Sequence, residues 1–268
     1  MSRRFETPEW HAALACLVAN TDFRSTAEAL IDTVGQVVDN DGTVLLAFHP
    51  DAPPEVLYHN LGPARSKHYL DRYLAGPYLL DPLYELALRR DKPGACRFRD
   101  ATPDRFRSSE YYRQYCERTH LRDEMDFLLD VGDDTACVVV VARIEKMFTK
   151  AELERLRLVE GLIHSTVRNI WRHWAARARD DGRNGDMHRR LTECFENFGE
   201  SLLTQREREI TQLLLRGHST KSIARELNIA PGTVMVHKRN LFSKLGITSQ
   251  YELFSRFIDA LSEPRSSG

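Results

Sequence analysis

The sequence predicts two structural parts, an α+β N-terminal domain followed by an all-α C-terminal domain. Short apolar runs bounded by turn residues, such as 43–49 and 135–144, alternate with amphipathic helical stretches in residues 1–179. Residues 201–268 instead carry helical periodicity without strand patterns. The polar, glycine-rich stretch 180–185 predicts a linker within residues 180–200. With 268 residues, the chain is long enough for each part to bury its own core.

The N-terminal domain is expected to be an antiparallel sheet flanked by helices. The predicted strands are residues 43–49, 55–59, 125–131 and 135–144, and the last is β-branched enough to be central. The predicted helices are two within residues 8–38, then 63–74, 82–90 and one that begins at Ser109. Residues 51–54 are expected to be a loop, and residues 91–107 a long surface loop, because they contain three Pro or Gly residues and little periodicity.

A long helix from Thr149 to Ala178 is predicted to close this domain. Thr149 and Glu152 form a capping-box pattern at its start. Its apolar stripe runs from Leu153 to Trp174 at helical spacing. Because ~45 Å of helix exceeds what one sheet face requires, we expect part of the stripe to pair with a second copy in a homodimer. The alternative is that the whole stripe packs on the chain's own sheet.

The C-terminal part is predicted to be four helices arranged around a helix-turn-helix. Thr204 and Glu207 form a capping box, and Gly217 ends the first helix. Ser219 or Thr220 caps the second helix, and Pro231 suits the first turn of the third. Ser249–Leu261 is expected to be the fourth helix, and His188–Phe198 a connecting helix before the domain.

The third helix, residues 231–245, has the pattern of a helix that enters the DNA major groove. Helices of this kind present three or four side chains to base edges, and here these are Met235, Val236 and Arg239. Arg239 can bond a guanine bidentately, whereas Met235 suits an apolar contact such as a thymine methyl. The predicted phosphate contacts are Thr220, Lys221, Thr233, Lys238 and Lys244. The alternative is a small helical bundle with no nucleic-acid role.

Charge is segregated along the chain in a way that favours DNA binding. The net charge of the whole chain is −1, but residues 201–260 contain nine Lys or Arg and five Asp or Glu, hence +4. The remainder therefore carries about −5. Basic charge thus collects in the part that has the helix-turn-helix pattern.

The C-terminal motif also resembles a known family. LTQRE, then GHSTKSIA, T-V-x-x-H and KLGI, is similar to the C-terminal DNA-binding domain of the LuxR/FixJ family of transcription regulators. The resemblance implies base contacts at Met235, Val236 and Arg239, and phosphate contacts at Thr233 and Lys221. Two positions depart from the family: Met235 stands where Lys or Arg is common, and Ala230 where a capping Ser is usual.

Tyrosines cluster in two helical patches of the N-terminal domain, which predicts a small-molecule pocket. These patches contain Tyr69, Tyr73, Tyr78, Tyr84, Tyr111, Tyr112 and Tyr115, with Asp81 between them. The pattern Y-x-x-x-Y followed by D-P resembles the autoinducer-binding domain of quorum-sensing LuxR regulators, and implies a ligand at Tyr69, Tyr73, Asp81 and Tyr84. The family's later Trp is absent, with Cys96 and Phe98 in that region, which argues against an acyl-homoserine lactone.

Each of these residues also has a purely structural interpretation. An aromatic stripe at helical spacing is ordinary core, and Asp81 before Pro82 is a typical helix cap. Asp123, Glu124 and Asp126 either face the same cavity and favour a cationic ligand or are a solvated strand end.

Several other classes of protein do not fit the residues. A phosphoacceptor receiver domain needs an acidic pair after its first strand, whereas residues 43–48 are followed by His49-Pro50. The five scattered cysteines form neither a zinc motif nor a disulfide framework. We find no catalytic constellation, cofactor motif, metal-ligand spacing, signal peptide or membrane span, and expect a cytoplasmic protein that is not an enzyme.

Together these patterns predict a one-component transcription regulator. A small-molecule effector in an α+β sensor domain of PAS/GAF or autoinducer-binding type would change how two helix-turn-helix domains bind double-stranded operator DNA. RNA polymerase is a further candidate partner. Two alternatives stay open at this point: a ligand-free protein-interaction module, or an enzyme, fused to the DNA-binding domain.

Overall fold

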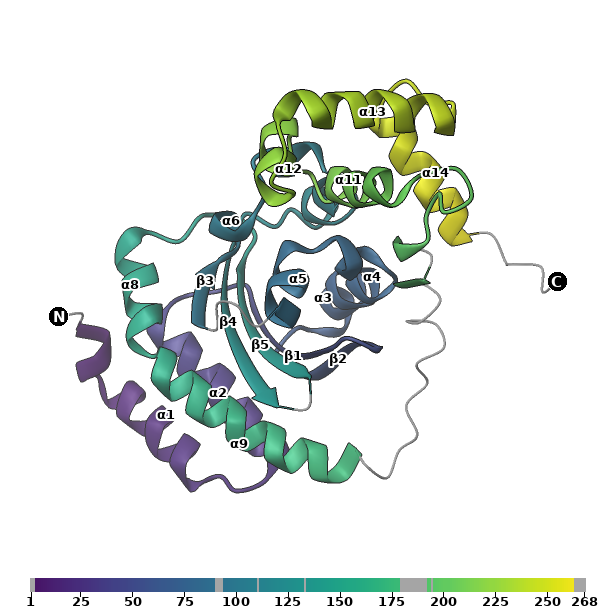
Figure 1. The fold of residues 1–268 in the computed structure, drawn as a ribbon. Coiled ribbons are helices and arrows are strands. Elements are labelled where there is room, and N and C mark those ends of the chain that lie inside the picture. Colours follow the sequence, from purple (N-terminus) through teal and green to yellow (C-terminus); the bar gives the residue numbers. More distant parts are fainter. Residues whose placement is uncertain are drawn as a thin grey trace.

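The computed structural model describes residues 3–89, 94–109, 111–132, 134–178, 192–193 and 195–262. A five-stranded sheet with helices on both faces forms the N-terminal domain, and the C-terminal helices stack beside one end of it (Figure 1). The predicted fold class is therefore confirmed. Within the described residues, no helix is long and apolar enough to cross a membrane.

The sheet is antiparallel throughout, in the order β2-β1-β5-β4-β3. Its strands are β1 (Gly42–His49), β2 (Ala52–His59), β3 (Gly94–Arg97), β4 (Asp123–Gly132) and β5 (Thr135–Arg143). The run of valines in β5 takes the central place that its sequence predicts, because both of its faces are covered by helices. β2 begins earlier than predicted, so the expected loop at residues 51–54 is mostly strand.

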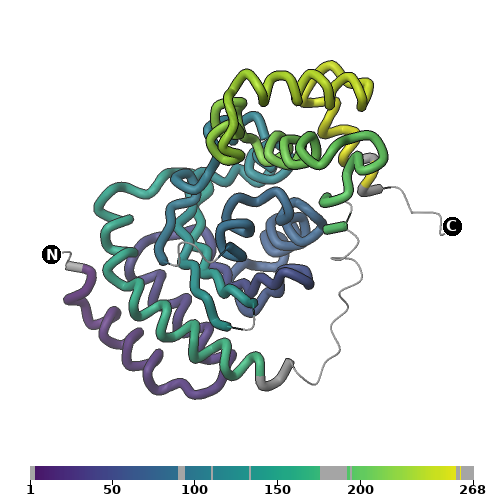
Figure 2. The backbone as a smooth tube through the Cα atoms, viewed as in Figure 1, coloured from purple at the N-terminus to yellow at the C-terminus, as the bar shows by residue number. Residues whose placement is uncertain are grey.

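One face of the sheet is covered by helices from both ends of the N-terminal domain. These are α1 (Pro8–Ala19), α2 (Phe23–Val37), α8 (Lys150–Leu158) and α9 (Glu160–Ala178). Figure 2 shows α9 running alongside α2 below the sheet. Side chains of alternate strand residues, such as Leu45, Phe127 and Val139, fill the space between.

The predicted helix 149–178 is two helices, not one, since the first ends at its C-cap Val159 and the second begins at Glu160. Its capping box, Thr149 with Glu152, is confirmed. Its apolar stripe is buried in the chain itself: Leu156, Ile163 and Ile170 are each at most 1% exposed. The stripe therefore needs no second copy, and the homodimer stays a proposal without this support.

The other face carries short helical segments that enclose a cavity. They are α3 (Pro63–Ser66), η2 (Lys67–Asp71), α4 (Arg72–Leu74), η3 (Pro77–Leu80), α5 (Pro82–Arg89), α6 (Phe98–Ala101), η4 (Phe106–Ser108), η5 (Tyr112–Cys116) and α7 (Glu117–Thr119). The remaining N-terminal element is the 3-10 turn η1 (Arg3–Glu6).

The prediction that residues 91–107 form a surface loop is wrong for its described part. Gly94–Arg97 pairs with β4 as the edge strand β3, α6 follows it, and Phe98 and Phe106 are buried. A short strand is fixed by its partner across the sheet rather than by its own periodicity, so the local pattern did not reveal it.

The C-terminal helices are α11 (Gln205–Leu215), α12 (Thr220–Glu226), α13 (Pro231–Leu245) and α14 (Gln250–Ser262). Their predicted caps are confirmed: Thr204 with Glu207 as a capping box, Ser219 on α12, and Gly217 at φ +92° after α11. Ile210, Ile223 and Leu241 are completely buried where the three helices meet. The predicted linker 180–185 lies outside the described residues, as does much of the predicted connecting helix 188–198.

Candidate functional site

A cavity lies between the sheet and the helices of its second face. Its floor comes from alternate residues of three strands. β1 and β5 contribute apolar side chains, Val44, Leu46, Val138 and Val140, and β4 contributes Glu124 and Asp126. Four tyrosines line the helical side: Tyr69, Tyr73, Tyr111 and Tyr115. An apolar chamber with a few convergent polar groups is the usual form of a small-molecule site.

Asp81 joins two walls of this cavity. Its Oδ2 atom accepts a hydrogen bond of 2.8 Å from the Tyr73 hydroxyl, and Oδ1 accepts one of 2.9 Å from the Leu83 amide at the start of α5. Asp81 is therefore a helix cap and a cavity residue at once, and its role in ligand binding stays a prediction. Burial raises the pKa of Asp81 to about 6, against the opposing effect of hydrogen bonds from Leu83, Tyr73 and Tyr111.

Two more carboxyl groups enter the cavity from β4. Because side chains alternate across a strand, Glu124 and Asp126 face the cavity whereas Asp123 faces away, paired with Arg97 at 2.6 Å. Burial, followed by the charge of Asp81, raises the pKa of Glu124 to about 8. Burial and the Glu124 charge also raise the pKa of Asp126 well above its usual value.

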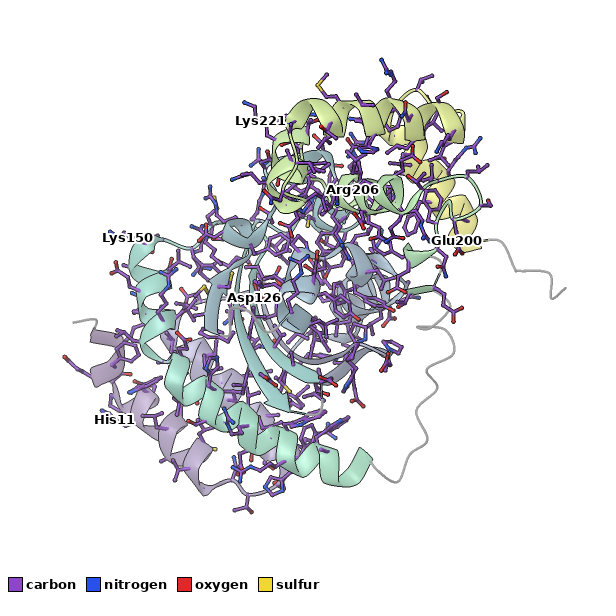
Figure 3. All side chains as sticks on the ribbon, in the orientation of Figure 1. His11, Asp126, Lys150, Glu200, Arg206 and Lys221 are labelled. Atoms are coloured by element: carbon purple, nitrogen blue, oxygen red, sulfur yellow. The ribbon has the colours of Figure 1, made fainter. Side chains whose placement is uncertain are left out.

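Asp126 and Glu124 form a buried pair of carboxyl groups. Asp126 is 0% exposed, its carboxyl shares a hydrogen bond with that of Glu124, and the other described residues donate none to it. Figure 3 places Asp126 inside the N-terminal domain. Buried carboxylates are usually paired with a cation, and the described lining of the cavity holds no cation for this pair.

Both π-helical turns of the domain border the cavity. η2 contributes Tyr69 and Leu70 to the lining, and η5 contributes Tyr115. π-turns inserted in helices are common at functional sites, and here each widens a helix at the point where a tyrosine enters the cavity.

Tyr84 was predicted to contact the ligand, but the structure places it outside the cavity. It does not line the cavity: its ring packs on Phe48 and Tyr78, and its hydroxyl donates to the His49 carbonyl at 3.1 Å. The side of α5 that carries Tyr84 faces the end of β1 rather than the chamber. Tyr111 and Tyr115 take its place in the lining, although the sequence pattern alone placed them only in the general tyrosine cluster.

The third helix of the C-terminal part, α13, presents its predicted base-reading residues to solvent. Met235 is 63% and Val236 47% exposed, and Arg239 is also exposed. Large apolar side chains are rarely left in water together without a reason. Lys221 and Thr233 are exposed on the same motif, and Lys221 lies at its outer edge in Figure 3.

Two of the predicted phosphate contacts already have partners. The Lys244 ammonium lies 2.7 Å from Glu207 Oε2, the carboxylate of the capping box. Lys238 lies over the Phe242 ring at 5.3 Å, and its pKa is lowered by burial and then by the nearby Arg105. Lys238 is half-buried, so its charge is less accessible than that of Lys221.

The C-terminal helices contact the segment that precedes the cavity tyrosines. Asp104 accepts a hydrogen bond of 3.0 Å from the Ser219 amide and a short one from its hydroxyl at the start of α12. A Cβ atom on Gly217 would lie 2.7 Å from Ser109 Cβ, so this contact is close. Two ion pairs, Arg216–Glu85 at 3.3 Å and Arg89–Glu226 at 3.2 Å, join the same surfaces through α5.

Within the described part of the chain, no three His, Cys, Asp or Glu side chains are placed to hold a metal ion. The described groups of the cavity are carboxyls, phenols and hydrocarbon. This arrangement can bind and orient a small organic molecule through hydrogen bonds and apolar contact.

Comparison with known proteins agrees with this geometry. Residues 201–257 match the family described as bacterial regulatory proteins, luxR family. The chain is 31% identical over 157 residues to an HTH-type transcriptional regulator in the exeN 3′ region of Aeromonas salmonicida, which covers 57% of this chain and 80% of that protein. It is 23% identical over 229 residues to the monoamine regulon transcriptional regulator of Klebsiella aerogenes, covering 84% and 87%.

The fold of the N-terminal domain has a solved counterpart. The VqsR LBD domain from Pseudomonas aeruginosa superposes with a TM-score of 0.55 at 20% identity, covering 62% of this chain and 99% of that one. Fold and motif together define a helix-turn-helix transcriptional regulator with an N-terminal α+β domain. The chain belongs to the LuxR family of bacterial transcriptional regulators.

Proposed function

We propose that this chain is a one-component regulator in which a small metabolite, bound in the N-terminal cavity, controls how the helix-turn-helix binds operator DNA in the cytoplasm. One observation carries the proposal: a single segment touches both sites. Tyr111 and Tyr115 line the cavity, whereas Asp104 and Ser109, a few residues earlier, contact the start of α12 and Gly217.

In this proposal the ligand contacts Tyr69, Tyr73 and Asp81, together with Tyr111 and Tyr115. The Tyr73–Asp81 pair is already fixed by a hydrogen bond and by the Leu83 amide, so its polar atoms are held in place before a ligand arrives. A site whose groups are preorganised loses less entropy when it binds.

The DNA face is α13 with the start of α12. Met235, Val236 and Arg239 would read base edges, and Lys221, Thr220, Thr233 and Lys238 would bind phosphates, which fixes register without reading sequence. Lys244 is placed instead to hold Glu207.

Control requires that the ligand prefer one arrangement of the two parts. A ligand that moved η5 would also move the 104–109 segment, and with it the contacts to Ser219 and Gly217. Thr220 and Lys221 directly follow that contact. The state of the cavity can therefore alter how the phosphate-binding end of α12 is presented.

A homodimer acting on a pseudo-palindromic operator remains part of the proposal, since paired helix-turn-helix units reach half-sites about one helical turn apart. The division of the chain at residues 180–200 and a contact with RNA polymerase are proposed on the same basis.

Two buried tyrosines give a matched test. Tyr73→Phe removes a hydroxyl inside the cavity, whereas Tyr84→Phe removes one outside it, and each loses a single hydrogen bond. Operator sequences are first selected from random duplexes and placed before a reporter, and small-molecule extracts of the host cell are then applied. We expect Tyr73→Phe and Asp81→Ala to lose the extract-dependent response while retaining non-specific DNA binding, and Tyr84→Phe to keep it. An equal response from both tyrosine variants would contradict the assignment of the cavity.

A further inference from the structure

Four carboxyl groups line the cavity, and its lining contains no Lys, Arg or His among the described residues. Asp41 lies at the rim, where its Oδ2 accepts a hydrogen bond from the Ile144 amide. Asp81 accepts from Tyr73 and Leu83. Glu124 and Asp126 lie deeper and share a hydrogen bond with each other, and the other described residues donate none to Asp126. The deep end of the chamber is therefore rich in acceptors and lacks a compensating positive charge.

We propose that the effector is an organic ammonium ion, with its cationic head at Asp126 and Glu124 and an apolar body against the tyrosines and the valine floor. This inference rests on the proposed function, because it names the ligand class of the same cavity. A primary ammonium carries three N–H donors and no acceptor, which complements the oxygens of a carboxyl pair that has no cation in the described lining.

The electrostatics favour a cation over a neutral ligand. Carboxylates buried together resist ionisation, because each loses its water and repels the other. A cation within hydrogen-bond distance reverses both effects, since opposite charge favours the ionised form. A neutral guest would leave the deep pair protonated, because it supplies no charge that favours the ionised form.

The shape and composition of the walls select the rest of the molecule. The hydrocarbon floor of Leu46, Val138 and Val140 accepts an alkyl or aryl group. The ring of Tyr115 packs on Tyr73 and on Tyr111, with centroids 5.5 and 5.3 Å apart respectively. Aromatic faces attract cations. The ligand class is therefore an amine with an apolar chain or ring.

Cation binding should release protons, which gives the proposal its readout. At pH 6 Glu124 holds a proton, and it ionises when the ammonium binds; above pH 8 it is ionised beforehand. The charged and titratable groups around this pair are Asp81, Tyr73, Tyr111, Tyr115 and Cys116 from the helices. From the sheet side, Asp123 acts on Glu124 and Cys96 on Asp126, and Asp123 is itself paired with Arg97. All of these except Arg97 are neutral or negative, so none of the cavity groups can supply the positive charge that the ammonium would bring to Glu124 and Asp126.

The test uses matched probes: hexylamine and 2-phenylethylamine against 1-hexanol and 2-phenylethanol, titrated calorimetrically into the full chain in two buffers of different ionisation enthalpy. We expect amine affinity to rise between pH 6 and pH 8, by up to about tenfold per pH unit for each proton released. The alcohols should bind at least tenfold more weakly than the amines and release no protons.

Variants of the cavity carboxyls test whether amine binding takes place in the cavity. Asp126→Asn and Glu124→Gln keep the shape and remove the charge, and each should weaken amine binding at least tenfold while leaving alcohol binding unchanged. Tyr84→Phe, outside the cavity, should change neither. Folding of each variant is checked by its unfolding transition.

The outcomes also separate this inference from the proposed function. Alcohols that bind as well as amines, amines that bind without proton release, or no amine binding at millimolar concentration would each overturn the ammonium proposal. A neutral compound that occupies the cavity and alters DNA binding would overturn it while supporting metabolite control. An amine that binds as expected but leaves DNA affinity unchanged would support the ligand class and contradict the proposed function.

Discussion

The two parts of this regulator place their charged groups in opposite ways. In the C-terminal helices the cationic side chains proposed to contact DNA, Lys221 and Arg239, are exposed, and the buried carboxylate of Glu207 is satisfied by Thr204 and Lys244. In the N-terminal domain Asp81, Glu124 and Asp126 are turned into an apolar chamber. The buried carboxylate of the C-terminal helices has its partners without DNA, whereas the N-terminal domain buries carboxyl groups that have no cation beside them in the described lining of the cavity.

The difference indicates how each part gains affinity for its ligand. Surface cations cost little to keep in water and gain affinity when counterions leave the DNA. Buried carboxylates destabilise the empty domain when they ionise, and a ligand that satisfies them recovers that free energy as affinity. We therefore expect the stability of the N-terminal domain to depend on pH and ligand, and that of the C-terminal helices to depend much less on either.

The largest expected effect is on the stability of the empty N-terminal domain as a function of pH. The pKa of Glu124 is raised from 4.5 to about 8, so the folded state binds this proton more tightly than the unfolded state. Its contribution is therefore fully present below pH 4.5 and is lost as pH rises to 8. The unfolding free energy should fall by roughly 3–5 kcal/mol across this window. Glu124→Gln should remove this part of the slope, as measured by urea unfolding at a series of pH values, and leave the part that comes from the raised pKa values of Asp81 and Asp126.

Glu152 is the matched control for this prediction. Its pKa is lowered to about 2, first by hydrogen bonds from Arg143, so its contribution is present above pH 4.5 and is lost as pH falls toward 2. Glu152→Gln should therefore leave the slope between pH 5 and pH 8 intact. If Glu124→Gln also left it intact, Glu124 would not be a source of the pH dependence.

The next effect concerns base reading by α13. Arg239→Ala should weaken operator binding by ~1–3 kcal/mol and relax preference at one base pair, because a bidentate guanine contact is lost. Lys221→Ala should instead weaken all duplexes alike and reduce the slope of log K against log salt by about one. Binding to selected and scrambled duplexes at several salt concentrations distinguishes them. Equal loss of specificity in both variants would show that the reading face lies elsewhere.

A smaller effect is expected where the two parts touch. Gly217 and Gly246 both have positive φ, at +92° and +62°, so Ala at either position should cost ~1–2 kcal/mol of stability. Only at Gly217 would the new Cβ meet the N-terminal domain, 2.7 Å from Ser109 Cβ; at Gly246 the nearest atom is an arginine nitrogen at 3.8 Å. Gly217→Ala should therefore also expose the 104–109 segment to proteolysis. Similar cleavage of both variants would argue against this contact in solution.

The smallest effect distinguishes two roles of Lys244. Its side chain is 40% exposed and pairs with Glu207 at 2.7 Å. A partly exposed ion pair contributes ~0–1 kcal/mol, so Lys244→Met should lower the stability of the C-terminal helices by no more than that. The salt slope of DNA binding should not change. A slope reduced by about one would instead assign Lys244 to a phosphate, as its position in the sequence first suggested.

The sequence was most informative where structure is decided locally. Capping boxes at Thr149 and Thr204, and the glycine that ends α11, are determined within one helical turn, and all were predicted. β3 was missed because an edge strand is defined by its partner β4, far along the chain. The break at Val159 was missed because the apolar spacing continues across it.

The cavity was only partly predictable for a related reason. Tyr73 and Asp81 were named from the resemblance to the autoinducer-binding domain, and both line the cavity. Tyr84 was named in the same way but points elsewhere, and Tyr111 lines the cavity, since helix orientation decides which ring reaches the chamber. Alternation along β4 could have separated Asp123 from Glu124 and Asp126. Only the fold shows that Asp126 is buried beside Glu124 with no cation in the described lining of the cavity.

Control of DNA binding from the N-terminal cavity is tested most directly by measuring coupling in both directions. The affinity of the chain for a selected operator duplex is measured with and without saturating 2-phenylethylamine, and the affinity for the amine with and without the duplex. Coupling between two sites is reciprocal, so both affinities should change by the same factor, about 5–150-fold, and Asp126→Asn should abolish both changes. An operator affinity that stays constant while the amine saturates the cavity would contradict control from this site.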